Sequence, residues 1–236
     1  MGKLKMGSAV IIGAGEGLSA SLARKLAKRG HKLVLAARNT DKLADLVAET
    51  GAVAVRCNAS DPADMEAVFA AADKLGEPLD IAIYNPSART RGSIVDLDPA
   101  TVKDAIMITA YGAFLMGQQA AKRMVPNGSG SILFTGASAG VKGYPMSSTF
   151  AMGKFALRGL AQSMARELHP KGVHIGHFVI DGGIRNPNRP ERIDAADNPD
   201  SMLDPEAIAD SYLHFIDQPR SSWAWEIELR PWVENF

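Results

Sequence analysis

The chain has 236 residues, which is long enough to bury a large apolar core within one α/β domain. Its 26 basic side chains are balanced by 26 acidic ones, so its charge does not favour nucleic acid or an anionic membrane as a partner. A single cysteine, Cys57, excludes an internal disulfide, and neither a membrane-spanning apolar run nor a secretion signal is visible. We therefore expect a cytoplasmic protein.

Apolar runs of strand length alternate along the chain with segments of helical periodicity. Strands are predicted at residues 9–12, 33–37, 52–57, 81–84, 131–135, 173–180 and 225–229. Helices are predicted at residues 18–29, 40–50, 62–75, 99–124 and 148–168, with Thr40 as the N-cap of the second. This alternation predicts an α/β fold with a doubly wound, seven-stranded parallel sheet and helices on both faces, in a single domain over residues 1–236.

One long segment, residues 185–203, has no periodicity and contains three prolines. It follows the sixth predicted strand, so it would lie over the crevice at the carboxyl ends of the strands. Long irregular loops in compact domains are usually functional or mobile. We predict a substrate lid here, with a disordered insertion as the alternative.

A glycine-rich turn joins the first predicted strand to the first predicted helix. Gly13, Gly15 and Gly17 allow a tight turn and a close approach of the backbone to a pyrophosphate, and the helix beginning at Leu18 would direct its N–H groups at that group. Because the turn directly follows an apolar strand and opens an amphipathic helix, it predicts a Rossmann-like dinucleotide site that includes Glu16. The alternative is that the glycines serve only the turn.

The residue that follows the second predicted strand bears on the choice of cofactor. An acidic residue there would bind the adenosine ribose and repel a 2′-phosphate, but this chain has Arg38. A guanidinium pairs well with phosphate, so we expect NADP(H) in preference to NAD(H). Glu16 argues mildly for the opposite choice, and a solvated surface arginine is the alternative reading of Arg38.

Two segments carry a resemblance to a known family: the turn Gly13-Ala14-Gly15-Glu16-Gly17-Leu18 and the later segment Phe150-Ala151-Met152-Gly153-Lys154. The whole chain resembles the short-chain dehydrogenases/reductases. These are single-domain NAD(P)-dependent oxidoreductases of about this length. The resemblance implies that further cofactor contacts come from positions beyond the turn. These positions are Asn58, Ala59, Asn85, Lys154, Gly182 and Ile184.

The same resemblance assigns the catalytic positions of the family. It places the family's helix Asn at Thr109, its Tyr at Phe150 and its Lys at Lys154. The family's Ser falls on Ala137 by counting back from the Tyr position, with Ser138 one step away. The chain therefore resembles a divergent subgroup that carries Phe in place of the proton-donating Tyr.

Phe150 has no proton to exchange with a substrate oxygen. Loss of a general acid typically removes about 10²–10⁴-fold of rate, which leaves hydride transfer possible when the geometry is held. Lys154 would still bind the nicotinamide ribose, and Tyr144 is a candidate substitute acid. We expect an atypical NADP(H)-dependent oxidoreductase acting on a small carbonyl or an activated alkene. The alternative is a catalytically silent NADP(H)-binding protein that serves as a sensor or partner subunit.

The expected partners are a small-molecule substrate and other copies of the same chain. All three tryptophans lie in the last fourteen residues, and aromatic side chains are enriched at interfaces. Members of the family commonly pair through this region and through two long helices, so a homodimer or homotetramer is expected. No metal site is expected, because His174 and His177 are three apart on a predicted strand and point to opposite faces.

Overall fold

The structure is a computed structural model that describes residues 6–186, 188–194 and 196–234. One seven-stranded sheet forms its middle layer, and every pair of neighbouring strands is parallel. The strand order is β3-β2-β1-β4-β5-β6-β7. The strands are β1 (Ser8–Ile12), β2 (Lys32–Ala37), β3 (Val53–Arg56), β4 (Leu79–Tyr84), β5 (Ser131–Thr135), β6 (His174–Ile180) and β7 (Glu226–Leu229).

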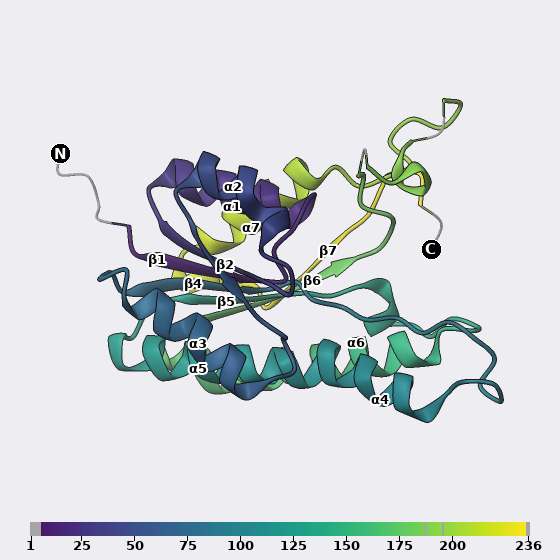
Figure 1. Ribbon diagram of the computed structural model, residues 1–236, viewed down its shortest axis with the longest axis horizontal. Coiled ribbons are helices and arrows are strands. Elements are labelled where there is room, and N and C mark those ends of the chain that lie inside the picture. Colours follow the sequence, from purple (N-terminus) through teal and green to yellow (C-terminus); the bar gives the residue numbers. More distant parts are fainter. Residues whose placement is uncertain (1–5, 187, 195, 235–236) are drawn as a thin grey trace.

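Helices cover both faces of this sheet (Figure 1). They are α1 (Leu18–Arg29), α2 (Ala44–Thr50), α3 (Pro62–Asp73), α4 (Pro99–Ile106), α5 (Gly112–Met124), α6 (Ser148–Leu168) and α7 (Pro205–Ile216). The first two helices and α7 lie on one face, and the other four lie on the opposite face. The predicted doubly wound parallel sheet of seven strands is confirmed.

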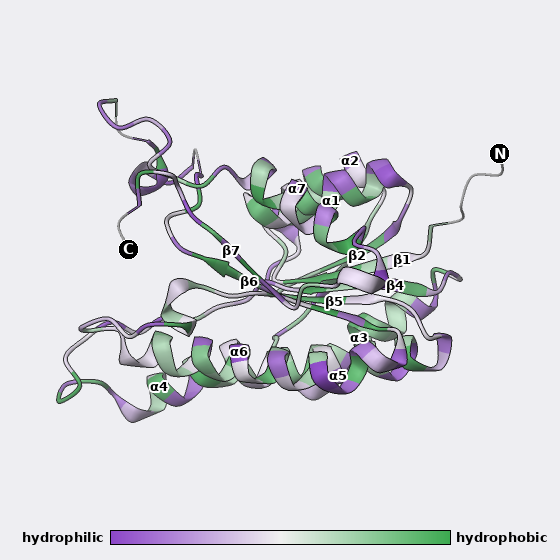
Figure 2. Cartoon of the chain, turned by 180° about the vertical axis from the view of Figure 1, so that it is seen from behind, coloured by the Kyte–Doolittle hydropathy of each residue, from purple (hydrophilic) through white to green (hydrophobic). Residues whose placement is uncertain are grey.

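The alternation of side chains along each strand divides the core into two layers. In β1, Val10 and Ile12 pack into the cluster shared with α3, α5 and α6, whereas Ala9 and Ile11 pack into the cluster shared with α1 and α7. Successive side chains of a strand point to opposite faces, so a strand covered on both sides must be apolar throughout. Figure 2 shows this as a sheet lined with hydrophobic residues between helices whose outer surfaces are more polar.

Two predicted elements differ from the structure. The long helix predicted at 99–124 is interrupted by a π-helical turn at Met107–Tyr111, which separates α4 from α5. The predicted N-cap Thr40 is wrong: its backbone is already helical and its side chain makes no capping hydrogen bond. A 3₁₀ turn at Asp41–Leu43 precedes α2 instead, and the Asn39 Oδ1 accepts a hydrogen bond from the Asp41 N–H at 3.0 Å.

The sheet order determines where a ligand can enter. The connections from β1 run towards β2 and β3 on one side and towards β4 to β7 on the other, so the direction of winding reverses between β1 and β4. Open α/β sheets bind ligands at such a point, beyond the carboxyl ends of the strands. The segment between β6 and α7 and the loops that precede α4 and α6 extend past this edge (Figure 1). Within the described residues no helix has both the length and the apolar character needed to cross a membrane.

Candidate functional site

A cavity lies where this fold geometry expects one. Its lining comes from the turn after β1, the ends of β4, β5 and β6, helix α6, and the segment after β6. Eight of the predicted site residues contribute to it. They are Glu16, Gly17, Leu18, Asn85, Phe150, Lys154, Gly182 and Ile184.

The glycine-rich turn has a left-handed backbone conformation at two of its glycines. Gly13 and Gly17 have φ angles of 77° and 78°, which L side chains rarely adopt. A Cβ at Gly13 would lie 2.8 Å from the ring of Pro86, so the turn packs tightly against the segment after β4. By contrast, a Cβ at Gly15 or Gly17 would meet nothing within 4 Å, so there is open space in front of the N-terminus of α1.

Asn85 connects the end of β4 to this turn. Its Nδ2 donates to Ser19 Oγ at 2.9 Å, and that hydroxyl donates to the Gly13 carbonyl at 3.1 Å. The backbone N–H of Asn85 donates to the Ile12 carbonyl. The predicted cofactor residue therefore acts on the turn through Ser19 as well as lining the cavity.

Glu16 links the turn to the segment after β6. Its Oε2 accepts a hydrogen bond from Asn188 Nδ2 at 2.8 Å, although the two residues are 172 positions apart. The two ends of the segment are joined by a parallel β-bridge between Ile184 and Leu203. These contacts hold the predicted lid above the cavity, with Pro187 and Ala195 of that lid lying outside the described residues.

Five predicted cofactor residues lie outside the cavity lining: Gly13 and Gly15 in the turn itself, and Arg38, Asn58 and Ala59 near the ends of β2 and β3. Arg38 follows β2, is exposed, and has no hydrogen-bond or ion-pair partner among the described side chains. Asn58 follows β3, where its N–H donates to Asp64 Oδ2 at 2.8 Å. Ala59 is buried, and its carbonyl oxygen would lie 2.5 Å from a Cβ at Gly112 of α5.

Lys154 and Phe150 lie one helical turn apart on the same face of α6. Lys154 is only 2% exposed, and its Nζ donates to the Thr135 carbonyl at 2.7 Å. Burial, with a further contribution from the positive charge of Arg89, lowers the pKa of Lys154 to about 7. The Nζ lies 5.8 Å from the centre of the Phe150 ring, so these two side chains form the floor of the cavity together.

Thr109 lies within the π-helical turn, where its side chain makes a structural hydrogen bond. It is 1% exposed, and its Oγ1 accepts a hydrogen bond from the Ala88 N–H at 3.1 Å. A Cβ at Gly153 of α6 would lie 2.9 Å from Thr109 Cβ, so the turn and α6 approach closely here. The predicted catalytic position is therefore near the cavity but outside its lining, where it anchors the loop after β4.

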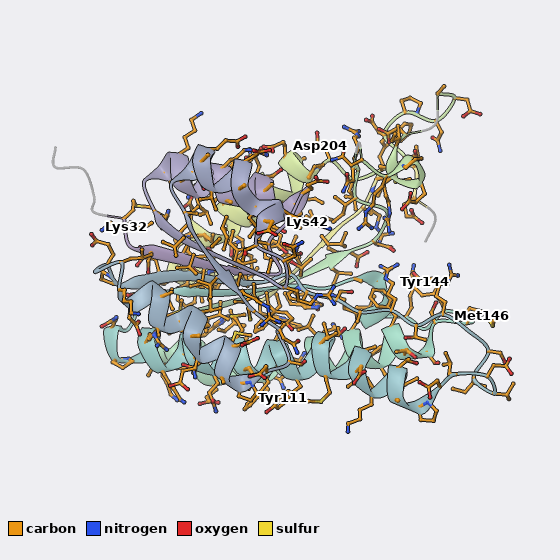
Figure 3. All side chains as sticks on the ribbon, in the orientation of Figure 1. Lys32, Lys42, Tyr111, Tyr144, Met146 and Asp204 are labelled. Atoms are coloured by element: carbon orange, nitrogen blue, oxygen red, sulfur yellow. The ribbon has the colours of Figure 1, made fainter. Side chains whose placement is uncertain are left out.

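The structure does not bring Ser138 or Tyr144 into the cavity lining. Ala137, the other candidate for the serine position, contributes to the lining instead. Tyr144 is 40% exposed, and Lys142 Nζ lies 5.6 Å from the centre of its ring. Figure 3 shows Tyr144 on the loop that precedes α6, beyond the edge of the sheet.

Sequence reasoning missed Arg89, which lies on the loop after β4. Its guanidinium carbon lies over the Phe150 ring, 3.9 Å from the ring centre, which is within the range of a cation–π contact. The available signal was its position four residues after Asn85, on a loop that follows a strand at the ligand-binding edge. Nothing in the sequence indicated that it would turn back onto α6.

His174 and His177 point to opposite faces of β6, as predicted. The His174 ring stacks on Phe215 of α7, whereas His177 Nδ1 lies 2.9 Å from Glu226 Oε2. Burial lowers the pKa of each to about 4, so both are neutral near pH 7. Among the described residues, no three His, Cys, Asp or Glu side chains are grouped to hold a metal ion.

Comparisons with known proteins agree with this architecture. The family model described as short chain dehydrogenase matches residues 8–192. An uncharacterized oxidoreductase of Staphylococcus aureus strain N315 is 28% identical over 228 residues, which are 94% of this chain and 96% of that protein.

Solved structures show the same fold over nearly the whole chain. The crystal structure of a short-chain dehydrogenase from Rhodopseudomonas palustris is 33% identical, with a TM-score of 0.81 over 95% of this chain and 98% of that one. A metagenomic short-chain oxidoreductase in complex with NADP has a TM-score of 0.81 at 22% identity, over 98% of this chain and 99% of that one. This chain belongs to the short-chain dehydrogenase family.

Proposed function

We propose that the protein is an NADP(H)-dependent oxidoreductase that acts on a small carbonyl or an activated alkene. The observation that carries this proposal is the cavity itself, which joins the glycine-rich turn of α1 to the buried amine of Lys154. A dinucleotide bound along the carboxyl edge of the sheet would reach both ends of it.

The residues present fit a nicotinamide dinucleotide. Open space lies in front of Gly15 and Gly17, where a pyrophosphate would meet the N–H groups of α1. Arg38 has no partner among the described residues and is free to pair with a 2′-phosphate. A structure of the same fold is known with NADP bound, which supports the choice of a nicotinamide cofactor.

When bound, the cofactor supplies or accepts the hydride. Lys154 would bind the nicotinamide ribose, since the Thr135 carbonyl holds its Nζ in place at the cavity floor. Gly182 and Ile184 would contact the nicotinamide end, and the segment after β6 would exclude water above it. Phe150 provides an apolar wall and no proton, so the proton that accompanies hydride transfer would come from water or another side chain.

A catalytically silent protein that binds NADP(H) is the second candidate function. The phenyl ring of Phe150 favours it, because this ring lies where the family resemblance expects the proton donor. Such a protein would use the same turn and the same Arg38, and it would act as a nucleotide sensor or partner subunit. The two candidates therefore differ in turnover and not in cofactor binding.

The cofactor assignment predicts a preference for NADPH over NADH in a fluorescence titration of the purified protein. The Arg38→Ala variant should bind NADPH about tenfold or more weakly, because it loses a charge-assisted pair, and should bind NADH almost unchanged. Equal affinities of the unaltered protein for both nucleotides would refute the role of Arg38. Absence of binding of either nucleotide would refute the proposed function.

Turnover separates the two candidate functions. NADPH oxidation should be measured with a panel of small ketones, aldehydes and enones, for the unaltered protein and for Phe150→Tyr. Activity in the unaltered protein supports the oxidoreductase, and the tyrosine variant should then be faster by about 10²-fold or more with carbonyls. An inactive parent with an active Phe150→Tyr variant would favour the silent binding protein.

A further inference from the structure

The cavity lining is strongly positive. It contains four arginines and one lysine, and Glu16 is the one carboxylate among the lining residues that the structure describes. The chain as a whole has no net charge, so this excess is local. A cavity of one sign, bounded by low-dielectric protein, concentrates ligands of the opposite sign.

Part of this positive charge is already balanced within the protein. Arg185 pairs with Asp194 at 2.7 Å and with Asp204 at 3.7 Å. Figure 3 shows Asp204 at the start of α7, beside the segment after β6. The pairing of Arg185 therefore stabilises that segment and leaves little of its charge for a ligand.

Arg89 and Arg192 are not balanced in this way. Neither has a carboxylate partner within ion-pair distance among the described residues, and both line the cavity. Arg89 is exposed as a residue, yet desolvation of its guanidinium in the cavity, with the positive charges of Arg192 and Arg91, lowers its pKa from the ordinary value. The guanidinium remains charged near neutral pH, and an anion beside it would relieve this repulsion.

Phe150 fixes the position of the Arg89 side chain. The contact at 3.9 Å is made by the guanidinium carbon over the aromatic ring, and the Phe150 side chain has no oxygen that could accept a hydrogen bond from the guanidinium. None of the N–H groups of Arg89 has a hydrogen-bond acceptor among the described residues. A planar fork of donors, held on a ring and without an acceptor, matches the two oxygens of a carboxylate or phosphate.

We propose that Arg89, with Arg192 beside it, binds an oxyanion carried by the substrate, so that the protein acts on carbonyl or enone compounds that also bear a carboxylate or a phosphate. This inference rests on the proposed function, because it assigns the substrate class of the same cavity. Phe150 is then the stacking surface that positions Arg89, which gives this residue a role that does not require a hydroxyl.

The position of Arg89 separates it from the expected phosphates of the cofactor. It follows β4 and packs on α6, whereas Asn188, on the segment that carries Arg185, is hydrogen bonded to the glycine-rich turn through Glu16. A cofactor pyrophosphate at the turn would lie next to the part of the segment around Asn188, whereas Arg192 lies farther along it, close enough to Arg89 for its positive charge to lower the pKa of Arg89. An anion bound at Arg89 should therefore bind together with the nucleotide and not in competition with it.

The test is calorimetric titration of the protein loaded with NADP⁺, using oxamate as the probe. Oxamate has a carboxylate next to an amide carbonyl that does not accept hydride, and methyl oxamate is its neutral counterpart. We expect oxamate to bind and its ester to bind at least about tenfold more weakly. Arg89→Gln should weaken oxamate binding about 10- to 100-fold, and Arg89→Lys should fall in between because it keeps the charge and loses the fork.

Arg91→Gln is the matched control, because it removes the same charge from the same loop at an exposed residue outside the cavity lining. It should change oxamate affinity by no more than about twofold. Equal binding of oxamate by Arg89→Gln and the unaltered protein, or equal binding of oxamate and its ester, would overturn the proposal. Inorganic phosphate in the same titration separates the two ligand sources: tighter binding of phosphate than of oxamate would assign phosphorylated substrates.

Failure of the proposed function gives a different result. If NADP⁺ does not bind, the oxamate and phosphate titrations are repeated on the nucleotide-free protein. A difference between Arg89→Gln and Arg91→Gln would then support the anion site alone. If neither probe binds to either form, the anion site is refuted, whatever the nucleotide titration shows.

Discussion

At the scale of single residues, Lys154 makes the most specific prediction about pH. Its pKa is lowered to about 7 in the folded protein, mainly by burial, and returns to its ordinary value of 10.5 on unfolding. Between these values the unfolded state binds more protons, so the contribution of Lys154 to stability increases with pH, by at most about 1.4 kcal/mol per pH unit. Below pH 7 Lys154 is charged in the folded protein as well, so the full free-energy cost of burying that charge lowers the stability of the fold.

Lys154→Met should therefore be most stabilising, relative to the unaltered protein, near pH 6, and this advantage should shrink steadily towards about pH 9. Urea unfolding of the nucleotide-free protein at a series of pH values measures the difference. The comparison removes the contribution of every other titrating group that the two proteins share. A difference that does not change with pH would show that the amine is not destabilised in the folded state.

The packing around Gly136 leaves no room for a side chain at this position. A Cβ there would lie 2.3 Å from His177 Nε2 and 2.8 Å from the Phe178 carbonyl oxygen, and the second atom belongs to the backbone of β6. Gly136→Ala should cost about 1–3 kcal/mol in urea unfolding, because β5 and β6 must shift apart. Gly143→Ala is the control, since its Cβ meets nothing within 4 Å, and it should leave stability nearly unchanged.

At the scale of elements, the π-helical turn between α4 and α5 connects the helix layer to the site. In this turn Thr109 Oγ1 accepts a hydrogen bond from the Ala88 N–H, and this bond holds the loop that carries Arg89. Thr109→Val keeps the shape and removes the acceptor, so we expect a loss of about 1–3 kcal/mol in urea unfolding. Thr109→Ser keeps the hydroxyl and should lose less. Equal losses in the two variants would mean that the methyl group, and not the hydrogen bond, matters.

The elements were predictable where local sequence determines them. The bounds predicted for α1, β5 and α6 agree with the structure, because glycines flank α1 and β5 and because the apolar pattern of α6 stops at His169-Pro170. The π-helical turn was not predictable, since one extra residue in a helix of small and apolar side chains changes the hydrophobic pattern very little. Its location follows from packing, in particular from the close approach of Gly153 to Thr109.

The site was predictable in part for a related reason. The glycine-rich turn, Asn85 and Lys154 lie on elements whose order along the sheet places them together, so strand topology was sufficient. The stacking of Arg89 on Phe150 depends on the path of an irregular loop, and no periodic pattern encodes that path. The same limitation applies to the link between Glu16 and Asn188, which joins residues distant in sequence.

At the scale of the whole molecule, the exposed apolar side chains bear on the predicted homo-oligomer. Phe114 of α5 is 42% exposed, Phe155 of α6 is 45% exposed, and Trp232 beyond β7 is 82% exposed. Large apolar side chains left in water are commonly covered by a partner when they form a patch. We expect light scattering after gel filtration to give the mass of a dimer or tetramer.

Variants at these three residues separate the two surfaces through which copies of the chain could pair. If the helices pair, Phe114→Lys and Phe155→Lys should shift the protein towards the monomer, because a charge placed at the centre of an apolar interface is left without water or a partner. Trp232→Lys should then have no effect, and the reverse pattern would assign the contact to the C-terminal strand region. A monomeric mass for the unaltered protein at micromolar concentration would contradict the prediction and leave all three side chains in water.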